Sequence, residues 1–206
     1  MLDELQENWS GLHRYGAARV HEPQTPDEVR RLVAGARRVR GLGSRHSFNE
    51  VADSEGGELI SLRKLPLDLV VDRERMRVTA SAGASYGELA AELDRHGLAL
   101  HNMASLPHVT LAGAVATGTH GSGDHNRGLA AAVRGIELVR PDGTLTEVAE
   151  GDPDWEGFPV SLGYLGLVTR LTLAVEPAFT VRQHVYRDIP WDVVLGHFDE
   201  IMAGAY

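Results

Sequence analysis

The distribution of glycine constrains the fold of this chain more than any other feature of its sequence. Many of the 23 glycines gather in clusters, between segments whose apolar residues have a regular period. The clusters lie at 41–43, 56–57, 113–128 and 157–166. Such clusters mark places where the backbone turns sharply or approaches another group closely. We therefore expect a fold built around several close backbone approaches.

Composition excludes several classes of protein. The 206 residues suit one large domain, or one domain and part of a second. The sequence has no cysteine, which excludes a thiolate nucleophile, an iron–sulfur cluster, a cysteine zinc site and disulfides. A formal net charge of −9 argues against nucleic acid or an anionic membrane surface as the main partner. No apolar run has the length of a membrane span, and residues 1–5 lack the features of a signal peptide. A cytoplasmic location is the expectation.

Two helices are predicted from their N-terminal caps. Thr25 and Ser85 are each followed three residues later by a glutamate, Glu28 and Glu88, and then by apolar residues at helical spacing. Each glutamate is expected to reach back to its cap. Gly97 is expected to end the second helix.

The remaining periodic segments predict strands. They lie at 39–42, 59–62, 69–71, 75–80, 133–140, 145–148, 167–175 and 181–187, and a last helix is expected at 189–202. Polar turns between neighbouring segments predict hairpins, one of them around Pro141-Asp142-Gly143. Because hairpins outnumber strict alternation of strand and helix, the predicted class is α+β.

The first glycine loop, 41–49, follows a predicted strand. Successive backbone amides in such a turn can form an anion-binding concavity, and Ser44 and Ser47 add hydroxyl donors. The loop matches neither the dinucleotide fingerprint nor the phosphate loop of nucleotide hydrolases. Taken alone, the loop slightly favours interpretation as a surface turn after a strand.

The second loop consists almost entirely of small residues from 112 to 123. Packing so many small residues together wastes core volume and costs backbone entropy, which the close approach of a large flat ligand would explain. A flexible linker is the alternative, but the apolar residues Leu111, Ala114 and Val115 argue against it. The third cluster, 157–166, has interleaved apolar residues and is also expected to pack.

The ten histidines allow a metal site in principle. His101 with His108, or His120 with His125, could converge, but neither pair has the helical i, i+4 spacing. No metal site is predicted. A Ser–His–Asp triad is equally unsupported, because Gly-x-Ser-x-Gly does not occur.

Four motifs carry a resemblance to a known family. They are Gly43-Ser44-Arg45-His46-Ser47-Phe48-Asn49, Asn102-Met103-Ala104-Ser105-Leu106-Pro107-His108, Ala116-Thr117-Gly118-Thr119-His120-Gly121-Ser122-Gly123, and Ser161-Leu162-Gly163 with Gly166-Leu167-Val168-Thr169. In order and spacing they resemble FAD-linked alditol (xylitol) oxidases of the vanillyl-alcohol oxidase / p-cresol methylhydroxylase superfamily. The first and third motifs are shared with sugar-lactone oxidases, whereas the second resembles the alditol group more narrowly.

The resemblance implies a two-part FAD-binding domain. Two α+β subdomains, at about 1–66 and 67–176, would hold FAD between them. Residues 177–206 would begin a substrate-binding domain, most of which lies beyond this sequence in the longer relatives. The chain is then expected to supply the FAD-binding half and to be inactive toward polyols by itself.

The resemblance also implies a set of site residues. The loop 41–47 would hold the pyrophosphate, 113–123 would line the other side of the cofactor, and His46 matches the histidine bonded covalently to the flavin 8α-methyl carbon. The cofactor-binding residues predicted in this way are Gly41, Leu42, Gly43, Ser44, Arg45, His46, Ser47, Ser105, Thr110, Gly113, Thr117, Gly118, Thr119, His120 and Val168. Val168 would contact the adenine end. Arg45 replaces a glycine of some relatives, and would pair with a phosphate or face solvent.

Ser105 is in addition the residue predicted to touch substrate. Its hydroxyl can donate to and accept from a polyol hydroxyl. The alternative is a turn serine that bonds backbone before Pro107.

The implied reaction is oxidation of a polyol such as xylitol or sorbitol to an aldose, with O₂ reduced to hydrogen peroxide. A sugar-lactone oxidase and a non-catalytic flavin-binding module are the alternatives.

Overall fold

The computed structural model describes residues 7–121 and 125–204. The predictions made for residues 1–5, for Ser122 and Gly123, and for the last two residues lie outside the described residues. The elements are β1 (Arg19–His21), α1 (Pro26–Gly35), β2 (Val39–Gly41), η2 (Glu50–Ala52), β3 (Glu58–Ile60), β4 (Val70–Asp72), β5 (Arg77–Ser81), α2 (Tyr86–Arg95), β6 (Leu98–Ala99), α3 (Leu111–Ala116), η3 (Leu129–Ala132), β7 (Val133–Val139), β8 (Leu145–Ala149), η4 (Trp155–Gly157), β9 (Leu167–Ala174), β10 (Glu176–Pro177), α4 (Trp191–Gly196) and α5 (Phe198–Ala203). The mixture of helices and sheets confirms the predicted α+β class.

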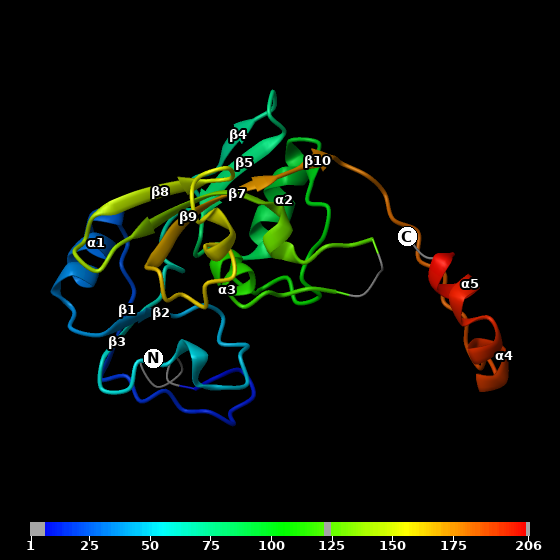
Figure 1. The fold of residues 1–206 in the computed structure, drawn as a ribbon, viewed down its shortest axis with the longest axis horizontal. Coiled ribbons are helices and arrows are strands. Elements are labelled where there is room, and N and C mark those ends of the chain that lie inside the picture. The colour runs from blue at the N-terminus through cyan, green and yellow to red at the C-terminus, as the bar shows by residue number, and fades with distance from the viewer. Residues whose placement is uncertain (1–6, 122–124, 205–206) are drawn as a thin grey trace.

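A small parallel sheet forms the N-terminal part of the fold. Its strand order is β1-β3-β2, and α1 connects β1 to β2. The buried face of α1 packs Val29 and Val33 against Ile60, Leu62 and Val139. Since Val139 belongs to β7, this core also joins the small sheet to the rest of the molecule (Figure 1).

The two predicted helix starts both form. The Thr25 side chain accepts a hydrogen bond from the Glu28 N–H, but the Glu28 carboxylate accepts from the N–H of Gln24 rather than from the cap itself. At α2 the capping box is complete, with Ser85 and Glu88 bonded reciprocally. Gly97 follows the end of α2 with a φ of +66°, as its predicted role requires.

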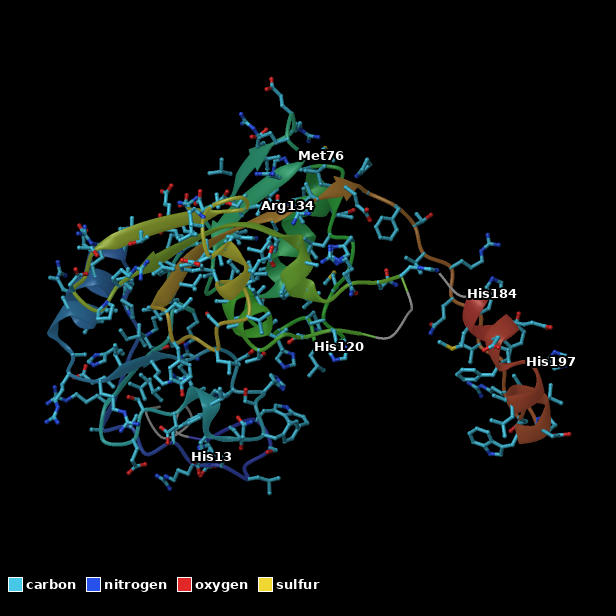
Figure 2. The ribbon with its side chains drawn as sticks, viewed as in Figure 1. His13, Met76, His120, Arg134, His184 and His197 are labelled. Atoms are coloured by element: carbon cyan, nitrogen blue, oxygen red, sulfur yellow. The ribbon has the colours of Figure 1, made fainter. Side chains whose placement is uncertain are left out.

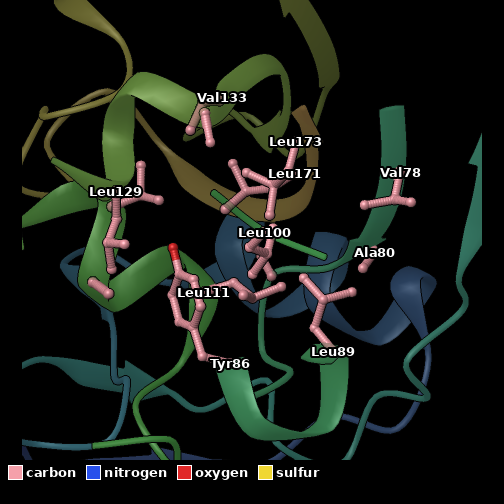
Figure 3. Packing of buried hydrophobic residues seen from close by; sticks show 14 of the residues in the cluster. Val78, Ala80, Tyr86, Leu89, Leu100, Leu111, Leu129, Val133, Leu171 and Leu173 are labelled. Atoms are coloured by element: carbon pink, nitrogen blue, oxygen red, sulfur yellow. The ribbon is translucent and has the colours of Figure 1, made fainter. Parts of the chain in front are cut away.

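A five-stranded antiparallel sheet forms the second part. Its strand order is β4-β5-β9-β7-β8, and β9 lies at the centre. The hairpin predicted from segments 69–71 and 75–80 and the hairpin predicted around residues 141–143 are both confirmed. Helices α2 and α3 cover one face, and Figure 3 shows their side chains meeting those of the sheet. The labelled residues are Val78, Ala80, Tyr86, Leu89, Leu100, Leu111, Leu129, Val133, Leu171 and Leu173. The two sheets lie on either side of the predicted subdomain boundary near residue 66, and the division into subdomains stays a prediction.

Helix α3 was not among the predicted elements. Leu111, Ala114 and Val115 are buried in the main core, which excludes the linker interpretation of this segment. The helix ends in a Schellman motif: the Gly118 N–H donates to Val115 and the Thr119 N–H to Ala114. The φ of +66° at Gly118 is the left-handed conformation that this motif needs.

The third glycine cluster is not packed as expected. Val160, Leu162 and Tyr164 have exposed fractions of 50%, 44% and 74%. Leu162 and Gly163 both have positive φ, of 53° and 73°, so the segment turns over the surface instead of entering the core.

The predicted strand at 181–187 is wrong, and the predicted helix at 189–202 is divided. Residues 178–190 have no regular structure, and α4 and α5 are separate short helices that meet at His197. Figure 1 shows this segment extending away from the sheets. A strand needs a neighbouring strand to accept its hydrogen bonds. The described pairing with β6 involves Glu176 and Pro177 and does not extend to residues 181–187. In the part of the chain that the structure describes, no helix has the length and apolar character needed to cross a bilayer.

Candidate cofactor-binding site

A cavity of about 300 Å³ opens between the two sheets. It is formed by the loop that follows β2, the residues that follow β3 and β5, the segment from Val109 through α3 to Thr119, and the segment that enters β9. Its lining residues are Arg40, Gly41, Leu42, Gly43, Ser44, Arg45, His46, Ser47, Val51, Ala52, Ile60, Leu62, Ala82, Gly83, Val109, Thr110, Ala112, Gly113, Ala114, Ala116, Thr117, Thr119, Leu162, Gly163, Gly166, Leu167 and Val168. Segments from both halves of the chain therefore share one cavity.

Bare backbone forms part of this wall. A Cβ atom added to Gly43 or to Gly113 would lie 2.7 Å from the Thr110 Oγ1, closer than real Cβ contacts allow. The Cα of Gly113 lies 3.6 Å from the Cβ position of Gly43. Side chains at these glycines would fill the space between the loop after β2 and the start of α3. The glycines thus keep open a cradle at which a ligand can approach backbone closely.

Thr110 lines the cavity and carries a buried hydroxyl. Threonine at a helix N-cap ordinarily accepts a bond from the first turn, but Thr110 makes no such bond. Within the described residues its Oγ1 is buried and has no hydrogen-bond partner, while its N–H donates to the Ser44 hydroxyl. A buried polar atom without a partner is costly, and a bound ligand would satisfy it.

The loop after β2 is held from outside the cavity. Its backbone accepts hydrogen bonds at Arg45 from the Trp9 N–H and at Ser47 from the Asn8 side-chain amide. Arg45 has a φ of +65°, which strains a residue with a side chain. Glycine would adopt this conformation without strain. The Arg45 guanidinium donates to the Glu7 carbonyl.

His46 lies in a half-buried contact with two other rings. Its Nε2 is 2.5 Å from the Nε2 of His108, and the ring centroids are 4.6 Å apart. The Trp9 ring lies on another side, at a centroid distance of 5.2 Å. Burial, together with the neighbouring His108 and Arg45, lowers the pKa of His46 below its usual value. The neutral imidazole is therefore favoured.

The structure brings twelve of the fifteen predicted cofactor residues to the cavity. These are Gly41, Leu42, Gly43, Ser44, Arg45, His46, Ser47, Thr110, Gly113, Thr117, Thr119 and Val168. The other three, Ser105, Gly118 and His120, are not among the described residues that line the cavity. Ser105 and His120 are exposed, and Gly118 serves the C-terminal cap of α3.

Several cavity-lining residues were not among the predicted cofactor residues, and two of them, Gly83 and Arg40, have close contacts across the site. Gly83 follows β5, and a Cβ there would lie 2.4 Å from the Leu62 carbonyl oxygen. The run of small residues around Gly83 is a signal that could have identified it. Arg40 donates to the carbonyls of Val51 and Leu162, and its guanidinium lies 4.2 Å from the centroid of the Tyr164 ring. Arg40 thereby ties three segments together at the cavity, which no sequence pattern indicated.

The histidine contact in the structure is neither of the two pairs that sequence spacing suggested. The ring nitrogen of His108 contacts His46, whereas the spacing along the chain had suggested His101 as its partner. Across the described ranges, no group of three or more histidine, aspartate and glutamate side chains is placed to hold a metal ion.

The comparison with known families indicates what kind of ligand this domain binds. A family model described as an FAD-binding domain matches residues 17–149. The chain belongs to this family of FAD-binding domains, of the p-cresol methylhydroxylase type. The predicted family is confirmed, and the match includes the loop after β2, Thr110 and α3.

Curated relatives of this FAD-binding chain are named as oxidases and dehydrogenases. An alditol oxidase of Streptomyces sp. (strain IKD472 / FERM P-14339) is 48% identical over 185 residues, which cover 89% of this chain and 45% of the relative. The L-gulonolactone oxidase of Mus musculus is 33% identical, over 84% of this chain and 40% of the relative. The L-gulono-1,4-lactone dehydrogenase of Mycobacterium tuberculosis (strain CDC 1551 / Oshkosh) is 32% identical, over 90% and 44%. This chain thus spans less than half the length of each relative.

The groups that line the cavity are of the kinds that bind FAD. A dinucleotide carries a pyrophosphate that backbone amides can bind, and flat rings that need close backbone approach. The loop 41–47 supplies amides and the Ser44 and Ser47 hydroxyls, and Gly43 and Gly113 leave the cradle open. The Thr110 hydroxyl supplies a buried donor that still lacks a partner in the described structure.

Proposed function

We propose that this chain is the FAD-binding part of an oxidase that converts a polyol, such as xylitol or sorbitol, to an aldose and reduces O₂ to hydrogen peroxide. The single observation that carries the proposal is the cavity, where Thr110 and the bare backbone of Gly43 and Gly113 meet the loop 41–47. The 48% identity to an alditol oxidase favours the polyol over a lactone.

Different residues of the cavity would bind different parts of the cofactor. The loop 41–47 would bind the pyrophosphate, Thr110 and α3 would line the length of the cofactor, and Val168 would contact the adenine end. Bound FAD supplies an acceptor for the hydride that leaves the alcohol carbon. The protein's part is to exclude water and to hold the flavin and the alcohol in a fixed relation.

A covalent bond between His46 and the flavin is part of the proposal. His46 lines the cavity, and its lowered pKa keeps the ring neutral, as a nucleophile must be. A tethered flavin does not dissociate. Acid precipitation should leave the yellow colour in the pellet of the wild-type chain, whereas His46→Ala should release it. Colour that washes out of the wild-type pellet would contradict the covalent bond, though not FAD binding.

Ser105 is proposed to contact the polyol outside the cavity that would hold FAD. Its hydroxyl is exposed and lies in the same segment as His108, which reaches His46. In the full-length protein, Ser105→Ala should slow polyol turnover by the equivalent of about 1 kcal/mol, one neutral hydrogen bond, with flavin content unchanged. An unchanged rate would leave Ser105 as a turn residue, and joint loss of flavin would assign it to the cofactor.

The decisive experiment for the function combines a visible spectrum with activity assays on two classes of substrate, polyols and a lactone. A visible spectrum of the purified chain tests whether flavin is bound. In the full-length protein, peroxide release with xylitol or sorbitol supports the polyol oxidase, and release with L-gulono-1,4-lactone alone supports the lactone oxidase. The similarity to the two lactone enzymes makes the lactone the second candidate. Flavin with neither activity would leave a binding module.

A further inference from the structure

The contact between His46 and His108 joins two loops that are 62 residues apart in sequence. Their Nε2 atoms are 2.5 Å apart, and the ring planes are inclined by 47°. At this distance there is room for one proton between the two nitrogens. One imidazole therefore donates and the other accepts, so the tautomers of the two rings are coupled.

Both histidines are carried by anchored backbone. The loop of His46 is fixed by its bonds to Asn8 and Trp9. On the other side, the Pro107 carbonyl accepts from the Gly87 N–H at 2.7 Å and the Val109 carbonyl accepts from the Tyr86 N–H at 3.0 Å. His108 is thus held between two bonds to the start of α2, and its approach to His46 is imposed by the fold.

The surroundings of His46 favour a neutral pair. The titratable and charged groups placed against it are Arg45 on its own loop and His108 on the segment before α3, and the Trp9 ring covers another side. Arg45 and His108 both disfavour a positive charge on the His46 ring. Protonation of both rings would place two cations in contact, which is unfavourable.

We propose that His108 is a positioning residue for His46: it accepts the Nε2 proton of His46, so that Nδ1 carries the free lone pair and is the nitrogen offered to an electrophilic carbon of the ligand. This inference rests on the proposed function, in which that carbon is the 8α-methyl of FAD. His46 lines the cavity, and its Nε2 is engaged by His108, which leaves Nδ1 for the bond. His108 acts through His46 and is not itself part of the link.

Formation of the bond to His46 replaces a C–H bond of the methyl group, with dioxygen as the final oxidant. The Nδ1–C bond forms, one C–H bond of the methyl group breaks, and its electron pair reduces the flavin ring. The positive charge that develops on the His46 ring is relieved when its Nε2 proton passes to His108. Dioxygen then takes the two electrons and two protons, one from the methyl group and one from the imidazole, and leaves as hydrogen peroxide. His108 is needed because its Nε2 lies 2.5 Å from the His46 nitrogen whose proton must depart.

Imidazole NMR of the chain without flavin tests the pairing on its own. The chain is made under riboflavin limitation and labelled with ¹⁵N. We expect His46 to show the Nε2–H tautomer in the wild type and in His108→Gln, whose amide oxygen can still accept. His108→Ala should show a mixture of tautomers and a His46 pKa closer to the usual value. His184→Gln, at an exposed histidine remote from the sheets in Figure 2, is the control and should change neither. An unchanged His46 tautomer and pKa in His108→Ala would overturn the proposal.

Flavin addition to the same samples tests the consequence. Total FAD bound should be similar in the wild type and in both His108 variants. The rate at which colour becomes resistant to acid should fall at least about tenfold in His108→Ala, as expected when a proton acceptor is lost. His108→Gln should recover part of this rate, since it restores orientation without proton uptake. An unchanged rate in His108→Ala would refute the role. If no FAD binds to the wild type, the proposed function fails, and the NMR result still decides the pairing.

Discussion

Replacing Gly83 by alanine tests the rigidity of the cavity wall. The Cβ of an alanine would lie 2.4 Å from the Leu62 carbonyl oxygen and 2.6 Å from both the carbonyl carbon and the Cβ of Leu62. Two of these three atoms belong to backbone, so rotation of a side chain cannot relieve the overlap. Either the segment of Gly83 or the segment of Leu62 must move.

Hydrogen bonds on both sides of Gly83 oppose such a movement. The Ala82 N–H donates to Thr169 in β9, and the carbonyls of Ala82 and Ala84 accept from Ala112 and Leu111 in α3. Leu62 is itself buried in the core under α1. Overpacking of a well-packed site costs about 1–3 kcal/mol. For a chain of this size, each kcal/mol lowers the melting temperature by about 2–4 °C, so Gly83→Ala should lower it by about 2–12 °C.

Thermal unfolding followed by circular dichroism measures this effect, with Gly35→Ala as the matched control. Gly35 is the last residue of α1, and a Cβ there meets nothing within 4 Å. The control should be neutral or slightly stabilising, because alanine is the better helix former. If the two variants melt at the same temperature, the overlap with Leu62 does not constrain the fold and the reasoning is refuted.

Three other substitutions test the cradle, a helix cap and a titration. Gly43→Ala should weaken FAD binding while leaving the melting temperature almost unchanged, because only the Thr110 side chain must move aside; equilibrium titration with FAD measures it, and unchanged affinity would argue against the cradle. Ser85→Ala should cost about 1 kcal/mol of unfolding free energy, since the capping bonds with Glu88 are lost; urea denaturation that shows no loss would contradict this. The lowered pKa of His46 means that the unfolded chain binds a proton more readily, so stability should fall as the pH drops below about 6.5. Denaturation at several pH values should show a smaller acid loss in His46→Gln, and an identical pH profile would refute the assignment.

Local signals in the sequence were sufficient where an element is stabilised by its own residues. The capping pair Ser85 and Glu88 and the turn at Gly143 each specify a boundary through bonds within a few residues, and these elements form as predicted. Segment 181–187 has a strand-like composition, but it joins none of the sheets in the described part of the chain. A strand depends on its partner, which a local pattern does not contain.

The site shows the same division between local and distant causes. A glycine in a ligand-binding motif can serve the ligand or the backbone, and Gly118 serves the Schellman motif of α3. Resemblance to a family indicates where such residues occur, but not which task each performs. The contact between His46 and His108 depends on two loops that are brought together by α2 and the parallel sheet. The spacing of the two histidines along the chain does not predict this contact.

The cradle itself is a property of three residues that no single motif contains. Gly43 belongs to the first glycine loop and Gly113 to the second, and a Cβ at either position would lie 2.7 Å from the same Thr110 hydroxyl. A side chain at either glycine would displace this hydroxyl, which is the buried polar atom that a ligand would satisfy. Replacement of one glycine therefore removes both the space and the donor, and replacement of the second can remove little more. Coupling of this kind is expected where residues share a partner, and it explains why two loops so distant in sequence must both remain bare.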